Sequence, residues 1–146
     1  MTSTLPTGIV ARTTELATAL AEWVSAHRGA TLAEHEEGVL GCVRAMLPTL
    51  LGEVVQASTP GLDGRHAPLR ECCPRCATRI ESVDWRERTV KTTCGRVSYE
   101  RPWYACAECH TGFSPADGTL GVPRLARISA GLQKWIVDLG STTDFR

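Results

Sequence analysis

Four cysteines, arranged as two Cys-x-x-Cys pairs, are the residues of this 146-residue chain with the clearest capacity for chemistry. The pairs are Cys73-Pro-Arg-Cys76 and Cys106-Ala-Glu-Cys109, and 29 residues separate them. Each pair can form a tight knuckle whose thiolates reach one ion at about 2.3 Å, and two knuckles complete the tetrahedron that zinc accepts. Because four thiolates leave no open coordination position, the sequence predicts one structural Zn²⁺ per chain and no catalytic metal.

Paired cysteines also form disulfides, redox motifs and iron sites. Two disulfides would need an oxidising compartment, and residues 1–10 have neither the basic nor the apolar region of a signal peptide. A thioredoxin-like motif needs one Cys-x-x-Cys at a strand-to-helix junction, not two matched pairs. Iron takes the same four ligands in rubredoxin-like sites, so the spacing leaves iron open as the less favoured ion. No apolar run approaches the roughly 18 residues of a membrane span, so we expect a cytoplasmic, reducing location.

Three further cysteines and one histidine are not expected to be ligands. Cys42 lies in a helical pattern and suits a small core position, whereas Cys94 lies in a proposed turn. Cys72 adjoins Cys73 but lacks the x-x spacing to Cys76. His110 follows Cys109 and is expected at the surface or beside the metal ligands. The roles of Cys72 and His110 stay open at this point.

The residues between the two cysteine pairs must hold structure of their own, and a β-hairpin suits them. We expect one strand over Arg86–Thr93, a turn at Cys94-Gly95 and a second strand over 96–106. Pro102 cannot donate to a ladder and belongs at an edge or a bulge. Residues 111–115 could add a third strand. The aromatic residues are expected to form the core of the hairpin rather than to stack on bases: Trp85, Tyr99, Trp103 and Tyr104.

The N-terminal part has two helical patterns. The first follows an N-cap at Thr13 or Thr14, and the second starts near Thr31 and contains Pro48, which predicts a kink or a break. The two helices could pair around Gly29-Ala30 or bury their apolar stripes in a dimer. The histidines and acidic residues of this part are expected on a solvated face: His27, Glu34, His35, Glu36 and Glu37.

A stretch rich in Pro, Gly and charge, residues 58–68, marks the expected boundary between the helices and the cysteine-bearing segment. A last helix is expected over Ala130–Leu139, capped by Ser129, with an apolar stripe of its own. The predicted fold is α+β, with a helical segment at 1–64, a zinc ribbon at 65–118, and a loop and helix at 119–146.

Charge is unevenly distributed although the net charge is zero. Residues 1–64 hold 3 basic and 7 acidic side chains, whereas residues 65–127 hold 11 and 7. A rigid hairpin could lay guanidinium groups along DNA phosphates, and the candidate contacts are Arg86, Arg88, Lys91, Arg96 and Arg101. The alternative for each is a solvated strand face with Glu87 or Glu100 as a partner. The excess of 14 Arg over 2 Lys suits phosphate contacts, although a GC-rich genome would produce the same bias.

The cysteine-bearing segment, over about residues 71–140, resembles the N-terminal region of ISKra-type insertion-sequence transposases. The resemblance lies in both cysteine pairs, Arg88-Thr-Val, Gly95-Arg-Val, Trp103-Tyr-Ala, Phe113 and Leu120-Gly-Val-Pro123. It implies a helical segment and a zinc ribbon, with Cys73, Cys76, Cys106 and Cys109 as ligands, ahead of a DDE-type catalytic domain. It departs from the family at Ala77, where glycine is frequent, and at Cys94, where an apolar residue is usual. No residue here matches the catalytic carboxylates, which would lie beyond Arg146.

Two functional hypotheses follow from the sequence. The first is a non-catalytic module that docks a transposase-like protein on double-stranded DNA. The second is a protein-interaction module in which the metal only stabilises the fold and the helices form a dimer or a docking surface. A redox role through bound iron is a third and weaker interpretation. Small-molecule substrates and a membrane are not expected as partners.

Overall fold

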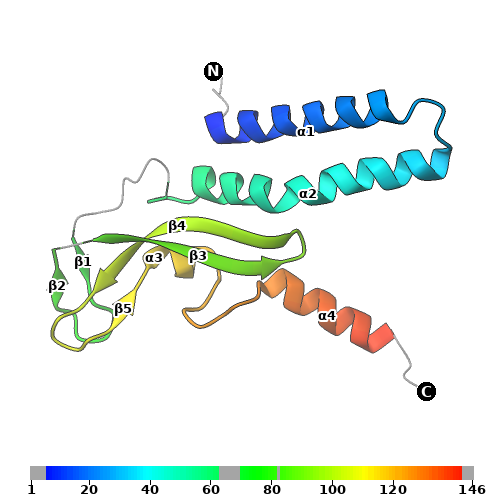
Figure 1. The fold of residues 1–146 in the computed structure, drawn as a ribbon. Helices are drawn as coiled ribbons and strands as arrows, with labels where there is room; N and C mark the ends of the chain where they lie inside the picture. The colour runs from blue at the N-terminus through cyan, green and yellow to red at the C-terminus, as the bar shows by residue number, and fades with distance from the viewer. Residues whose placement is uncertain (1–5, 63–69, 82, 143–146) are drawn as a thin grey trace, which may run out of the picture.

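The computed structural model describes residues 6–62, 70–81 and 83–142. It confirms the α+β class, because two N-terminal helices are followed by small antiparallel sheets and a C-terminal helix (Figure 1). The elements are α1 (Thr7–Ala26), α2 (Leu32–Ser58), β1 (Glu71–Cys72), β2 (Arg79–Ile80), β3 (Asp84–Thr92), β4 (Gly95–Ala105), β5 (Gly112–Phe113), α3 (Pro115–Thr119) and α4 (Ala130–Thr142). β1 pairs with β2, and the second sheet has the order β3-β4-β5.

The helices α1 and α2 form an antiparallel pair, here called the helical layer, and α2 lies between α1 and the strands (Figure 1). The second helix starts where the sequence predicted, because Thr31 and Glu34 form a reciprocal capping box. The first helix begins at Thr7, six residues before the predicted Thr13 cap. The prediction was wrong because the hydroxyl groups of Thr13 and Thr14 donate back to the Val10 carbonyl inside the helix, at 2.9 Å.

Pro48 does not break α2, which runs without interruption over 27 residues. Among the described residues, α2 is the one helix long and apolar enough to cross a membrane by length and composition, with a mean hydropathy of 1.5 over its best 18 residues. The sequence analysis expected no such segment. Core helices of soluble proteins pass the same test when they are buried, but only 6% of this window is buried within the chain. Most large apolar side chains of α2 are half-buried, and four of them are exposed, Leu32, Val39, Leu40 and Val54.

The β-hairpin of β3 and β4 extends from the pair Asp84–Trp103 to the pair Thr92–Gly95. Its turn consists of Thr93 and Cys94, one residue earlier than predicted, because Gly95 with φ 109° is already paired with Thr92. Alternate positions are buried, as the period-two pattern predicted. Pro102 lies opposite Trp85, in a part of β4 that pairs only with β3. The N–H group that proline lacks would face no strand there, as expected for an edge position.

Buried apolar side chains form two small clusters, one on each half of the hairpin. The first gathers Leu62, Val90, Tyr99, Ala116 and Val122, and the second gathers Cys73, Ile80, Tyr104 and Cys106. In contrast, no described residue of α1 is buried, and Gly52 is the only buried residue of α2. The core of the chain thus lies on the strands and not in the helical layer.

The sequence analysis did not anticipate the two-residue strands β1 and β2 or the short helix α3. It did anticipate β5 and α4. The hydroxyl oxygen of Ser129 accepts from the Leu132 amide at 3.1 Å, which confirms the predicted cap of α4. The segment before α4 is held on β3, because the Lys91 amide donates to Arg127 and the Lys91 carbonyl accepts from Ser129, both at 2.9 Å. In the predicted boundary segment, Leu62 is fully buried and residues 63–69 lie outside the described part.

Two glycines of α2 provide a matched test of how closely α2 approaches β4. A Cβ on Gly52 would lie 2.9 Å from the Ser98 carbonyl oxygen, whereas a Cβ on Gly41 would meet nothing within 4 Å. Alanine in a helix is favoured over glycine by about 0.5–1 kcal/mol. We expect Gly41→Ala to raise the free energy of unfolding by about that amount and Gly52→Ala to lower it, in chemical denaturation. Equal effects of the two substitutions would contradict the close contact.

Candidate metal centre

Two knuckles with the same backbone geometry carry the four cysteines. β1 and β2 flank the first knuckle, and β4 and β5 flank the second. The Cys73 amide donates to the Thr78 carbonyl, and the Cys106 amide donates to the Thr111 carbonyl, each at 2.9 Å. The residue after each second cysteine has a positive φ, which is the conformation that lets the chain turn back to the next strand. The strands therefore present two equivalent thiol pairs to one another.

The four sulfur atoms lie close enough to share one ion. Cys73 and Cys109 are 3.5 Å apart, Cys76 and Cys106 are 3.5 Å apart, and Cys76 and Cys109 are 3.6 Å apart. All four ligand atoms lie within 4.8 Å of one another. Metal–sulfur bonds of about 2.3 Å in a tetrahedron imply sulfur–sulfur separations of roughly 3.8 Å. The predicted ligand set therefore converges as a possible metal site, and the donor set fits a thiophilic ion.

Burial differs across the site. Cys73 and Cys106 are buried, Cys109 is half-buried and Cys76 is exposed. The inner side rests on the second apolar cluster, in which the rings of Tyr104 and Phe113 stack at 5.6 Å between centroids. This packing fixes the buried pair of thiols, and the knuckle turns stay at the surface.

Neighbouring groups shift the proton affinity of three of the thiols. Hydrogen bonding with the Thr111 side chain lowers the pKa of Cys109 to about 6, and contacts with Thr78 lower the pKa of Cys76. At Cys106 the Cys109 backbone hydrogen bond acts to lower the pKa, but burial and the adjacent thiols outweigh it and raise the pKa to about 11. The knuckles thus favour the thiolate form at one cysteine of each pair, which is the form that binds metal.

The remaining cysteines and His110 lie outside this cluster. Cys42 is half-buried on α2, Cys94 is half-buried in the hairpin turn and Cys72 is exposed on β1. His110 occupies the positive-φ position of the second knuckle, with φ 55°. In the described part of the chain, Cys73, Cys76, Cys106 and Cys109 are the one group of three or more metal-ligating side chains that converges.

Two of the five predicted DNA contacts are buried structural residues. Arg88 donates to Asp117 at 2.7 Å and to the carbonyl oxygens of Pro123 and Ala126 at 2.7 and 3.0 Å. Arg101 lies 3.3 Å from the other carboxylate oxygen of Asp117. Burial raises the pKa of Asp117, and the two guanidinium groups counteract that shift. Since the side chains of Arg88 and Arg101 are only 7% and 9% exposed, neither is accessible to a phosphate in this fold.

The other three predicted contacts, Arg86, Lys91 and Arg96, are exposed, but they lie on opposite faces of the hairpin. Arg86 pairs across the strands with Arg101, and both lie over the half-buried ring of Trp103. The guanidinium of Arg124 joins them, 5.7 Å from the ring centroid. Sequence analysis missed Arg124 because only the docking of the 123–126 loop on Arg88 brings it to the hairpin.

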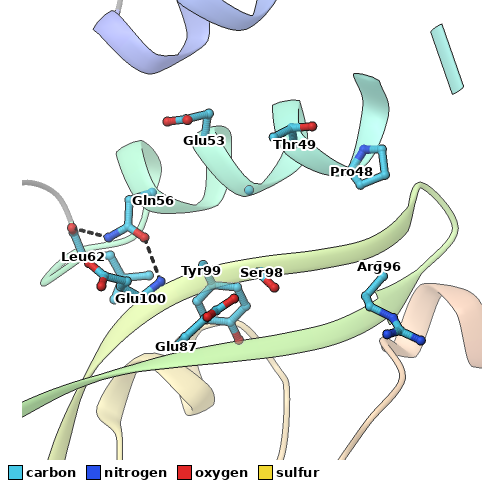
Figure 2. Close-up of a pocket in the computed structure, with 11 residues that line it drawn as sticks. Pro48, Thr49, Glu53, Gln56, Leu62, Glu87, Arg96, Ser98, Tyr99 and Glu100 are labelled. Atoms are coloured by element: carbon cyan, nitrogen blue, oxygen red, sulfur yellow. Dashed lines mark hydrogen bonds between the residues drawn. The ribbon is translucent and has the colours of Figure 1, made fainter. Parts of the chain in front are cut away.

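The opposite face of the hairpin forms an open groove of about 550 Å³ beneath α2 (Figure 2). Its acidic side chains are Glu53, Glu87 and Glu100, and Glu87 pairs directly with Glu100 across the strands. Gln56 spans the groove, since it accepts from the Glu100 amide at 3.2 Å and donates to the Leu62 carbonyl at 2.7 Å. Arg96 also lines the groove and pairs with Lys91 on the same face, so this face of the hairpin carries both acidic and basic side chains.

Single cysteine substitutions test the ligand set. We expect the wild-type protein to bind one metal ion per chain, measured by elemental analysis of protein prepared under reducing conditions. Cys76→Ser or Cys109→Ser should lose most of that metal, because three thiolates and a hydroxyl form a poorer site. Cys72→Ser and Cys94→Ser are matched controls and should keep it. Loss of metal from Cys72→Ser would mean that the first pair is assigned wrongly.

The knuckle backbone gives a second test. Ala77 has φ 60°, a conformation that costs a residue with a Cβ about 1–2 kcal/mol and glycine almost nothing. After allowing for the greater freedom of glycine in the unfolded chain, Ala77→Gly should stabilise the metal-bound fold by about 0.5–1 kcal/mol. Ala107→Gly, in the second knuckle but without a positive φ, should destabilise it. Thermal unfolding under saturating metal would distinguish the two, and destabilisation by Ala77→Gly would contradict the argument.

Comparisons with known proteins add no identification of this site. No family model matches the chain, and neither a curated protein nor a solved structure matches it. The resemblance of the cysteine pairs and flanking segments to ISKra-type transposases thus stays a prediction from motifs.

Proposed function

We propose that this chain is a zinc-stabilised DNA-binding module of a transposase-like protein, which docks on double-stranded DNA and performs no chemistry of its own. The observation that carries the proposal is the group of arginines around Trp103, next to the metal knuckles. Arg86 and Arg124 are exposed there, and the buried Arg101 lies 4.7 Å from the same ring. Two exposed guanidinium groups, one on β3 and one on the loop before α4, suit contacts with two phosphate oxygens.

The charge balance around this ring favours an anionic partner. Four guanidinium groups and two carboxylates lie around the ring or behind it. The cations are Arg86, Arg88, Arg101 and Arg124, and the anions are Asp84 and Asp117. Nη1 of Arg101 is buried and has no acceptor among the described protein atoms. The positive charge is therefore only partly compensated within the chain. Phosphate groups of nucleic acid carry the complementary charge.

The role of the metal in this proposal is structural. Cys73, Cys76, Cys106 and Cys109 would hold Zn²⁺ with no open position, so the ion supplies cross-linking and no Lewis-acid chemistry. The half-buried ring of Trp103 rests on Gly112, where a Cβ would lie 2.4 Å from the ring. Because Gly112 belongs to β5, which follows the second knuckle, fixing the knuckle also fixes the ring and the arginines above it. Iron in the same site is the runner-up, and absorption of visible light by ferric thiolate would reveal it.

A protein-interaction module is the second candidate function. Its specific support is the helical layer, in which large apolar side chains remain exposed. Val24 is 59% exposed, Leu40 is 48% exposed and Val54 is 39% exposed. This candidate requires no DNA affinity, whereas the first requires affinity that falls with salt.

A DNA titration at two salt concentrations separates the candidates. We expect zinc-loaded protein to bind a labelled duplex, followed by fluorescence anisotropy, with an affinity that falls steeply as salt rises. The double variant Arg86→Gln with Arg124→Gln should bind several-fold more weakly, with a logarithmic salt slope shallower by about 2, because about one counterion is released per phosphate contact. Arg44→Gln on α2 is the matched control and should behave as wild type. A wild-type protein whose binding is absent or insensitive to salt would refute the DNA proposal.

A further inference from the structure

The helical layer has one face, away from the strands, that the described chain covers only in part. α2 makes its contacts over one side only. Toward α1, a Cβ on Gly38 would meet Trp23, and Glu53 pairs with Arg12 at 3.5 Å. Toward the strands, Gly52 approaches Ser98 as described above. Pro48 and Val55 also contact the strand half, near Gly95 and in the first apolar cluster. At 100° per residue the contact positions of α2 fall within a little less than half of the helix circumference.

The opposite side of α2 is an apolar strip. Leu40, Val43, Leu47, Leu50 and Val54 follow one another at spacings of three, four, three and four residues. This is the repeat with which helices pack side by side in bundles and coiled coils. Leu40 and Val54, at the two ends of the strip, are 48% and 39% exposed, and the three residues between them are only half-buried. The nearest charged residues, Glu36 and Arg44, lie at one end and at the margin.

The first helix continues the same face. Its side toward α2 is marked by Gly8, Arg12 and Trp23. Rotation about α1 in the same sense as on α2 leads to a neighbouring sector without charged residues, which holds Ile9, Thr13, Leu16, Leu20 and Val24. Thr13 and Val24 are exposed there, whereas Ile9, Leu16 and Leu20 are half-buried. The two helices are antiparallel (Figure 1). Turning in the same sense about each helix axis, away from the partner helix, therefore leads to the same side of the pair. The two sectors thus form one uncharged face on the side of the layer away from the strands.

We propose that this face, the α1–α2 apolar face, is covered by the same face of a second copy of the chain, which makes a four-helix homodimer. The face spans 15 residues of α2 (40–54) and 16 residues of α1 (9–24), about 23 Å, and two helix widths of about 10 Å each. The projected area, roughly 450 Å², is a little over half of the roughly 800 Å² per partner of a standard interface. A two-fold axis matches the face with itself, so like heptad strips meet and every apolar residue gains an equivalent partner.

Two other occupants are disfavoured by the chemistry of the face. Nucleic acid requires basic groups, and the two sectors contain none at their centre. A helix that spans a bilayer exposes all its sides to lipid, but Glu53 and Gln56 of α2 bond to Arg12 and to the Glu100 amide within the chain. The dimer covers only the side that is apolar and leaves those polar contacts intact.

Sedimentation equilibrium tests the dimer without DNA. The full chain is used zinc-loaded and in a thiol reductant, so that its seven cysteines form no intermolecular disulfides. We expect a mass of about twice 15.8 kDa at micromolar concentration. The double variant Leu40→Glu with Val54→Glu should weaken dimerisation at least tenfold, because it buries carboxylates opposite their own copies. Val137→Glu on α4, where the native side chain is 68% exposed, is the matched control and should remain dimeric.

Further measurements keep the outcome decisive. Far-UV circular dichroism and metal content should be unchanged in the Leu40→Glu, Val54→Glu variant, since both positions are solvent-exposed in the monomer. If helicity falls, Val24→Glu on α1 replaces it and should also give monomers. A monomeric wild type, a dimer that survives both sets of changes, or flotation of the wild type with phosphatidylcholine vesicles would overturn the proposal. The Arg86→Gln, Arg124→Gln variant should remain dimeric, so this test can fail independently of DNA binding.

Discussion

The convergence of four sulfur atoms from two distant knuckles is the constraint on which the strand half of the chain depends. Its apolar clusters hold five and four buried residues, which is a small core for a fold of this length. A structural zinc site contributes on the order of 10 kcal/mol to folding, comparable with the whole stability of a small domain. Two of the four residues in the second cluster are themselves ligands, so the apolar packing and the site assemble together.

A buried ion pair connects the strands that carry the metal knuckles to the loop that precedes α4. Arg88 on β3 binds the carboxylate of Asp117 on α3 and two carbonyl groups of the loop that precedes α4. Removing one partner would leave a buried charge uncompensated, which makes such a contact costly to break even where its formation adds little stability. Arg88 therefore fixes the loop that brings Arg124 to Trp103. A buried arginine positions the exposed one.

The sequence predicted those features of the fold and of the metal site that depend on residues close together in the chain. Cysteine spacing predicted which four thiols converge, and alternating side chains predicted the hairpin. The capping pair Thr31 and Glu34 is likewise a local signal, and it lies where α2 begins. The wrong predictions had two physical causes. Thr13 and Thr14 have the side chains of caps, but helix interiors accept them when the hydroxyl bonds backwards. Arg88 and Arg101 share the period-two register of the buried residues Val90 and Val97, but an arginine is seldom buried without a partner, and that partner, Asp117, is distant in the sequence.

The basic surface proposed to bind DNA and the apolar surface proposed to form the dimer lie on different parts of the chain. The arginines near Trp103 lie on the strands and on the loop before α4, and the uncharged face lies on α1 and α2, with the groove beneath α2 between them. Since the two surfaces do not overlap, DNA bound at Trp103 would not compete with a second copy at the helices. A two-fold dimer would carry two arginine groups related by the same axis, which is the arrangement that reads paired half-sites in duplex DNA. Modest affinity at each arginine group would then be multiplied by simultaneous binding, without any further contact.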